Sequence, residues 1–165
     1  MRVKTIYIEK KVKSHPNTLN ILKNVHSTRI IYCDNYSEIF NTNNQNFRIQ
    51  KKVPSLILAK KETNFLYQAP KSFTIGYSNN YYFSHMLNCP YDCQYCYLQG
   101  SLNSSNYLIF VNYEDFFKAI KYKIQKNNKI SCFFSGYESD NLALDKVTNF
   151  LENFILNFKN LNKAF

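Results

Sequence analysis

The sequence of 165 residues has no tryptophan and no long run of apolar residues. Its opening, MRVKTIYIEK, lacks the apolar segment that follows the first charges of a signal peptide. These absences exclude a signal peptide and a membrane span, and they predict a cytoplasmic protein with no membrane partner. Charged residues are also scarce, at 19% against 45% hydrophobic residues, which excludes wholesale disorder. By length the chain is one domain, or a small domain plus part of a second.

Acidic residues are rare in the first third of the chain. Residues 1–61 contain 12 Lys and Arg against 3 Asp and Glu, a net charge of +9, whereas residues 62–165 carry only +1. A basic surface of this kind suits the phosphate backbone of DNA. The alternative is a lysine-rich solvated surface with no ligand, and charge by itself does not decide between the two.

The segment 1–72 reads as a small α/β domain. Strand character is found at residues 5–9, 29–33 and 56–59, and residues 17–25 read as a short helix behind a proline. Residues 41–46 are polar and rich in asparagine, which predicts a loop.

The segment 73–165 has a different order of predicted elements: strand, cysteine loop, helix, strand, loop and helix. Residues 81–83 end the first strand, Asn112 is placed as the N-cap of the first helix, and residues 130–135 form a buried strand. The last helix is predicted to begin near Asp140 and to bury one stripe of apolar residues: Leu144, Val147, Leu151, Phe154, Ile155 and Phe158. Two successive βα units predict a parallel sheet or barrel.

Three of the five cysteines lie within eight residues, as Cys89, Cys93 and Cys96, with the spacing C-x3-C-x2-C. Disulfides do not persist in the cytosol, so clustered thiols indicate a metal or redox role. Spacings of two and three residues allow the thiolates to converge on one centre.

Three cysteines leave the identity of that centre open. A zinc site requires four ligands, and His85 is the nearby residue able to complete a Cys3His set. A 4Fe-4S cluster held by three cysteines instead leaves one iron free to bind a substrate or cofactor. A third interpretation is that the thiols bind nothing and belong to a core turn.

The cysteine loop, with Tyr97 directly after its last cysteine, resembles the cluster loop of radical S-adenosylmethionine enzymes. The longer strings Tyr81–His85 and Cys96–Gly100 resemble the spore photoproduct lyase branch of that superfamily. Further similar stretches are residues 50–60, 110–112 and 134–140. The resemblance therefore extends over nearly the whole chain.

The resemblance implies that Cys89, Cys93 and Cys96 ligate a 4Fe-4S cluster. It implies that S-adenosyl-L-methionine binds the open iron and is cleaved to methionine and a 5′-deoxyadenosyl radical, with the electron coming from a flavodoxin or ferredoxin type of reductant. Tyr95 or Tyr97 is expected near the adenine.

A second implied contact is the turn after the strand 130–134. Ser135, Gly136 and Glu138 are expected there to meet the amino group of the methionine moiety. The alternative for the end of this turn is a helix cap, which is the favoured role of Asp140.

Lesion repair is the family function that the resemblance implies, acting on the thymine dimer of spore DNA. In such enzymes a cysteine of this turn returns a hydrogen atom to the product radical. Tyr137 occupies that position here, and Cys132 lies five residues earlier on the strand. Tyr137 is therefore a catalytic candidate at a position where the family uses a different residue.

Length is the other departure. After residue 88 there remain 77 residues, enough for two βα units of roughly 30 residues each, whereas a complete barrel needs on the order of 200. The fold expected is a small N-terminal α/β domain followed by the first two βα units of an incomplete radical SAM (TIM-like) barrel. A separately encoded C-terminal half is then an expected partner, and an inactive gene fragment or a Cys3His zinc module that binds nucleic acid are the alternatives.

Overall fold

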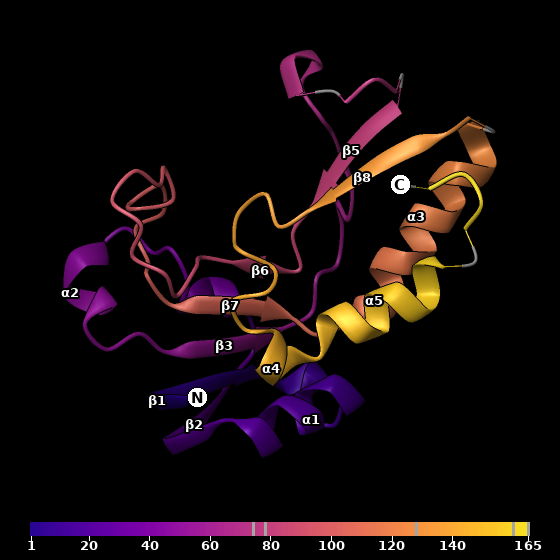
Figure 1. Ribbon diagram of the computed structural model, residues 1–165. Coiled ribbons are helices and arrows are strands. Elements are labelled where there is room, and N and C mark those ends of the chain that lie inside the picture. Colours follow the sequence, from indigo (N-terminus) through magenta and orange to yellow (C-terminus); the bar gives the residue numbers. More distant parts are fainter. Residues whose placement is uncertain (74, 78, 128, 160, 165) are drawn as a thin grey trace.

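The fold was described from a computed structural model that covers residues 1–73, 75–77, 79–127, 129–159 and 161–164. Within these residues the strands form two sheets, with strand orders β2-β1-β3-β7-β6 and β4-β5-β8. Figure 1 shows the smaller sheet above the larger one, with α3 and α5 side by side next to β8. Both sheets combine with helices, so the fold is mixed α/β.

The larger sheet is built around two apolar strands. β1 (Arg2–Glu9) pairs in parallel with β2 (His26–Cys33) and with β3 (Leu56–Ala59). β3 pairs in parallel with β7 (Tyr107–Phe110), and β6 (Met86–Leu87) adds to β7 in the antiparallel direction. All residues of β3 and β7 are buried, as expected for central strands covered on both faces.

The predicted elements of the first segment are present with shifted ends. α1 (Pro16–Asn24) joins β1 to β2, and η1 (Lys10–Val12) precedes it. The asparagine-rich segment lies between η2 (Tyr36–Glu38) and α2 (Phe47–Lys51). β6 and β7, from beyond residue 72, complete the sheet of the first segment, and the division into domains 1–72 and 73–165 stays a prediction.

The smaller sheet contains the parallel pair predicted from the βα pattern. β5 (Asn79–Phe83) pairs in parallel with β8 (Ser131–Ser135), and α3 (Tyr113–Asn127) lies between them in sequence. β4 (Tyr67–Gln68) pairs with β5 in the antiparallel direction, and η3 (Lys71–Phe73) separates these two strands. The register joins Phe83 to Ser135, so both strands end at the same edge.

The two faces of β3 divide the core. Leu56 and Leu58 pack on one face with Ile6, Ile8 and residues of α1. Ile57 and Ala59 point to the other face and join an aromatic cluster that includes residues of β5, α3 and α5. This division follows from the alternation of side chains along a strand.

The last predicted helix differs from the structure. It begins later and is broken into α4 (Asp145–Thr148) and α5 (Phe150–Phe158), because Asn149 takes a left-handed backbone with φ of 54°. The break turns the chain, so residues before and after it do not share one face. Leu151 and Ile155, predicted to be in the buried stripe, are 38% and 54% exposed.

Candidate functional site

The cysteine loop connects β6 to β7 and begins at Asn88, which is buried and has a left-handed φ of 65°. The Asn88 side-chain amide donates to the carbonyl oxygens of Ser104 (2.7 Å) and Asn106 (2.8 Å), on the far side of the loop. Its backbone N–H donates to the carbonyl oxygen of Glu138 at 3.1 Å. Asn88 thus closes the base of the loop and joins it to the turn after β8.

Cys89, Cys93 and Cys96 are half-buried free thiols that line one hollow. The Cys96 N–H donates to the Cys93 carbonyl oxygen at 3.0 Å, which forms the turn between them. Across the residues that the structure describes, no three His, Cys, Asp or Glu side chains are grouped closely enough to hold a metal ion. The three cysteines therefore share a hollow without forming a closed ligand set. The chemistry of the site still fits a thiolate-bound cluster, because the three cysteines supply soft sulfur ligands and line the same hollow.

The other two cysteines are in different surroundings. Cys33 ends β2 and Cys132 lies in β8, and both are buried. Burial raises the pKa of both thiols, and the nearby Glu9 carboxylate adds to the rise at Cys33. These two cysteines stay protonated and unreactive at neutral pH.

The turn after β8 is fixed to the end of β5. The Gly136 N–H donates to the carbonyl oxygen of Phe83 at 3.0 Å, and the Glu138 N–H donates to the Ser84 hydroxyl at 3.3 Å. Gly136 has φ of +77°, and a Cβ there would lie 2.9 Å from the Ser139 carbonyl oxygen. The structure thus brings Gly136 and Glu138 beside the cysteine loop through Asn88, and Ser135 is exposed at the end of β8.

Asp140 caps a turn and not a helix. Its carboxylate accepts hydrogen bonds from the N–H groups of Leu142 (2.8 Å) and Ala143 (3.1 Å), but α4 begins only at Asp145. The carboxylate of Asp140 thus accepts backbone hydrogen bonds as a cap does. The prediction that it caps the following helix is wrong.

Tyr97 of the cysteine loop contacts Tyr137 of the turn after β8. The Tyr97 hydroxyl donates to the Tyr137 carbonyl oxygen at 2.5 Å, and the Tyr137 ring packs 4.5 Å from that of Tyr82. Burial raises the pKa of Tyr97 and of Tyr82, so both phenols stay protonated at neutral pH. Tyr95 is 92% exposed and joins none of these contacts. Of the two tyrosines expected near an adenine, the structure brings Tyr97 to the strand ends.

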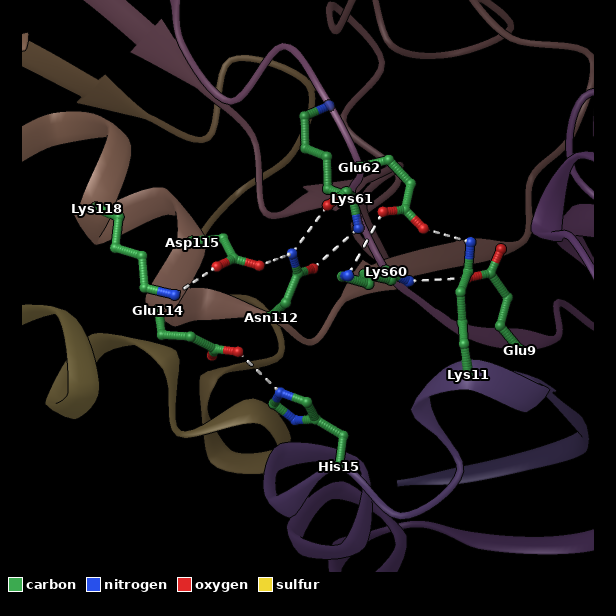
Figure 2. Close-up of polar contacts among 10 residues, drawn as sticks. All are labelled: Glu9, Lys11, His15, Lys60, Lys61, Glu62, Asn112, Glu114, Asp115 and Lys118. Carbon is green, nitrogen blue, oxygen red and sulfur yellow. Dashed lines mark hydrogen bonds and ion pairs between the residues drawn. The ribbon is translucent and has the colours of Figure 1, made fainter. Parts of the chain in front are cut away.

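A polar network lies at the carboxyl ends of β1, β3 and β7, and sequence reasoning missed it. Figure 2 shows Asn112 between the Lys61 backbone and Asp115. The Asn112 side chain accepts from the Lys61 N–H and donates to the Lys61 carbonyl oxygen, both at 2.9 Å. Asn112 therefore joins the end of β3 to the end of β7. It is also the residue directly before α3, as predicted for an N-cap, but its side-chain oxygen accepts from Lys61 and not from the helix.

Glu9 is a fully buried carboxylate in the same network. One of its oxygens accepts from the Tyr36 N–H and the other from the Lys60 N–H, each at 2.9 Å. Lys11 lies 3.6 Å from Glu9 and forms a shorter ion pair of 2.6 Å with Glu62 (Figure 2). Hydrogen bonds to both oxygens make this burial of a charge possible.

Lys61, whose backbone is part of the network, has a half-buried side chain. Its ammonium lies 4.8 Å from the centroid of the Phe110 ring. Burial lowers the pKa of Lys61, and the Glu138 carboxylate acts in the opposite direction. The residues flanking Lys61 are all polar, so no sequence pattern distinguishes this half-buried lysine from the exposed ones.

His85 is in the aromatic core and not with the cysteines. Its ring stacks on Phe150 at 3.5 Å between centroids and meets Tyr113 edge-on at 5.9 Å. The side chain is 1% exposed, and its Nδ1 has no hydrogen-bond partner in the structure. The imidazole that the alternative Cys3His zinc site would need thus packs against rings of α3 and α5.

Acid should destabilise the fold through His85. Burial lowers its pKa to about 3, from 6.5, so the unfolded chain binds the additional proton at intermediate pH. The stabilising contribution is complete above pH 6.5 and is lost as the pH falls toward 3. The variant His85→Phe retains a ring on Phe150 but has no group to protonate. Between pH 7 and 4.5 its free energy of unfolding should therefore fall by about 2 to 3 kcal/mol less than that of the wild-type chain. Urea unfolding at both pH values measures this, and an equal fall in both proteins would contradict it.

Comparisons with known proteins identify the family. The family model described as spore photoproduct lyase matches residues 3–164. No curated protein matches the sequence. A solved spore photoproduct lyase variant with bound AdoMet and dinucleoside spore photoproduct has a TM-score of 0.77 and 19% identity, over 98% of this chain and 48% of its own. A second structure, complexed with dinucleoside spore photoproduct, has a TM-score of 0.76 and 19% identity, with the same two coverages.

The chain thus spans about half the length of the solved proteins that it matches. Within the described residues no helix is long and apolar enough to cross a membrane. The family match covers both sheets and the cysteine loop between β6 and β7. The chain belongs to the spore photoproduct lyase family.

Proposed function

We propose that this chain is the S-adenosylmethionine-binding half of a radical enzyme. Cys89, Cys93 and Cys96 would hold a 4Fe-4S cluster, and the observation that carries the proposal is that these three residues line one hollow, in a loop that Asn88 joins to the turn after β8. Such a cluster supplies the electron that cleaves the sulfonium of S-adenosylmethionine to methionine and a 5′-deoxyadenosyl radical. A solved relative that binds AdoMet supports the choice of cofactor.

The residues of the turn after β8 have complementary tasks in this proposal. The half-buried Glu138 carboxylate would receive the ammonium of the methionine moiety, and the left-handed Gly136 lets the backbone approach closely. Ser135 would line the same site. Tyr97, held by its hydrogen bond to the Tyr137 carbonyl oxygen, would pack near the adenine. Tyr137 would occupy the place of the hydrogen-atom donor.

The proposed architecture is the start of a radical SAM barrel. The parallel pair of β5 and β8 with α3 between them supports two βα units. β8 is the last strand of its sheet, where Ser131 forms a bridge to Ala164, and α5 exposes Leu151, Ile155 and Leu156. A C-terminal half that packs beside β8 and covers this face of α5 is the partner proposed here, because such an apolar face otherwise stays in water.

DNA carrying the thymine-dimer photoproduct is the proposed substrate. Its support is that relatives bind dinucleoside spore photoproduct. The lysines of residues 1–61 would contact phosphates, and a flavodoxin or ferredoxin type of protein would deliver the electron.

The test is anaerobic reconstitution of the chain with iron and sulfide. We expect about four iron atoms per chain and a broad absorbance near about 400 nm, as for thiolate-bound Fe-S centres. Addition of S-adenosylmethionine and dithionite should then yield 5′-deoxyadenosine, measured by chromatography. Bound zinc without iron would contradict the cluster and favour the zinc module. Iron without deoxyadenosine would favour the inactive fragment, and the same assay with the C-terminal half present separates loss of the partner from loss of function.

A further inference from the structure

Lys51, the last residue of α2, extends its ammonium to the cysteine loop. Its Nζ donates to the carbonyl oxygens of Cys89 and Tyr91, both at 3.1 Å. The same ammonium lies 5.7 Å from the centroid of the Phe47 ring. Lys51 is half-buried and lines the hollow together with Cys89, Cys93 and Cys96. A positive charge is therefore built into the wall of the hollow.

The adjacent residue fixes the other end of the loop. The Gln50 side-chain oxygen accepts from the Ser105 N–H (3.0 Å) and from the Ser104 hydroxyl (3.2 Å). The short α2 is itself set by Asn46, whose side-chain oxygen accepts from the Ile49 N–H at 3.1 Å. Neighbouring residues of α2 thus hold the loop at residues 89–91 and at residues 104–105.

Among the described residues, no carboxylate forms an ion pair with Lys51. The nearby Asp92 accepts a hydrogen bond from the Gln99 amide at 2.9 Å. The two partners of its ammonium are neutral carbonyl oxygens. Its positive charge is therefore not offset by an ion pair within the part of the chain that the structure describes.

We propose that Lys51 is a positioning residue that holds the cysteine loop and raises the reduction potential of the cluster bound there. The proposal rests on the function proposed above. Reduction adds one electron to the cluster, and a fixed positive charge stabilises the more negative state. Hydrogen bonds and charge around thiolate sulfurs are among the factors that set such potentials. Holding the loop needs only a donor, whereas raising the potential needs the charge.

The experiment compares Lys51→Met, which removes charge and donors, with Lys51→Arg, which keeps both. Each variant is reconstituted as for the wild-type chain, and the potential is measured by a redox titration followed by electron paramagnetic resonance. At one applied potential we expect the ratio of reduced to oxidised cluster to fall about tenfold in Lys51→Met and to stay near wild type in Lys51→Arg. Lys52→Met, at the exposed next position, is the matched control.

The outcomes separate this proposal from the one on which it rests. A wild-type chain that binds no iron overturns both. Normal iron content with an unchanged ratio in Lys51→Met overturns the role of Lys51 alone, as does an equal fall in Lys52→Met. If Lys51→Met binds no cluster, Lys51→Gln takes its place in the titration. Loss of iron in Lys51→Gln as well, which keeps a donor, would show that the loop needs more than a donor and overturns the proposal.

Discussion

Replacing Cys93 by serine is expected to remove nearly all iron from the reconstituted chain and with it the absorbance near about 400 nm. A hydroxyl is a hard, weakly acidic donor, and two remaining thiolates do not hold a cluster built for three. Cys93 is half-buried on a surface loop, and it is its carbonyl oxygen, not its thiol, that accepts the Cys96 N–H. The free energy of unfolding of the metal-free chain should therefore change by less than about 0.5 kcal/mol.

Cys132→Ser is the matched control for this change. Cys132 carries the same chemical group in the same chain, but it is buried in β8, and burial raises its pKa. The control should retain the iron content of the wild-type chain. It should lose stability instead, because a hydroxyl replaces a thiol in an apolar site. Equal iron contents for Cys93→Ser and the wild-type chain would show that the clustered thiols are not the ligands.

Much of the fold could be predicted from the sequence where local pattern and burial agree. The apolar run 56–59 became β3, and the strand ending at residue 83 became β5. α3 begins directly after Asn112, with Glu114 and Asp115 in its first turn as expected. These elements are buried on the faces that their apolar residues define, so sequence period and tertiary packing point to the same structure.

The errors arose where a single residue or a distant partner decides the structure. The helical period of residues 144–158 continues through Asn149, and only its left-handed backbone breaks the helix. His85 is four positions from Cys89 in sequence, yet stacking on Phe150 takes its ring into the core. The alternative of a Cys3His zinc site rested only on the nearness of His85 to the thiols along the chain.

The sequence indicates the cysteines of the candidate site but not the residues that support their loop. The spacing of the three cysteines is visible in the sequence, whereas Lys51 meets the loop from 38 positions before Cys89. Asn88 joins the loop to Glu138 across 50 positions. Contacts of this kind depend on how β7 and β8 are placed beside earlier strands, and no local period carries that information.

Gly136→Ala is expected to have the largest effect on stability among changes at the site. L-residues pay roughly 1 to 2 kcal/mol for the left-handed backbone that Gly136 adopts at φ of +77°. The added Cβ would also lie 2.6 Å from the Asn141 side-chain oxygen and 2.9 Å from the Ser139 carbonyl oxygen. The side chain of Asn141 can turn aside, but the Ser139 carbonyl belongs to the backbone. We expect a total loss of about 2 to 4 kcal/mol in the free energy of unfolding, measured in urea.

Gly76→Ala separates the two parts of this loss. Gly76 has a similar φ of +68°, and a Cβ there would meet nothing within 4 Å. Its alanine variant should lose only the conformational part, about 1 to 2 kcal/mol. The excess at Gly136 then measures the crowding of the turn, and equal losses would show that the turn can open to admit a methyl group. A turn that cannot open keeps the hydrogen bond from the Gly136 N–H to the Phe83 carbonyl oxygen. It therefore keeps Tyr137 and Glu138 at the end of β5, where the proposed function needs them.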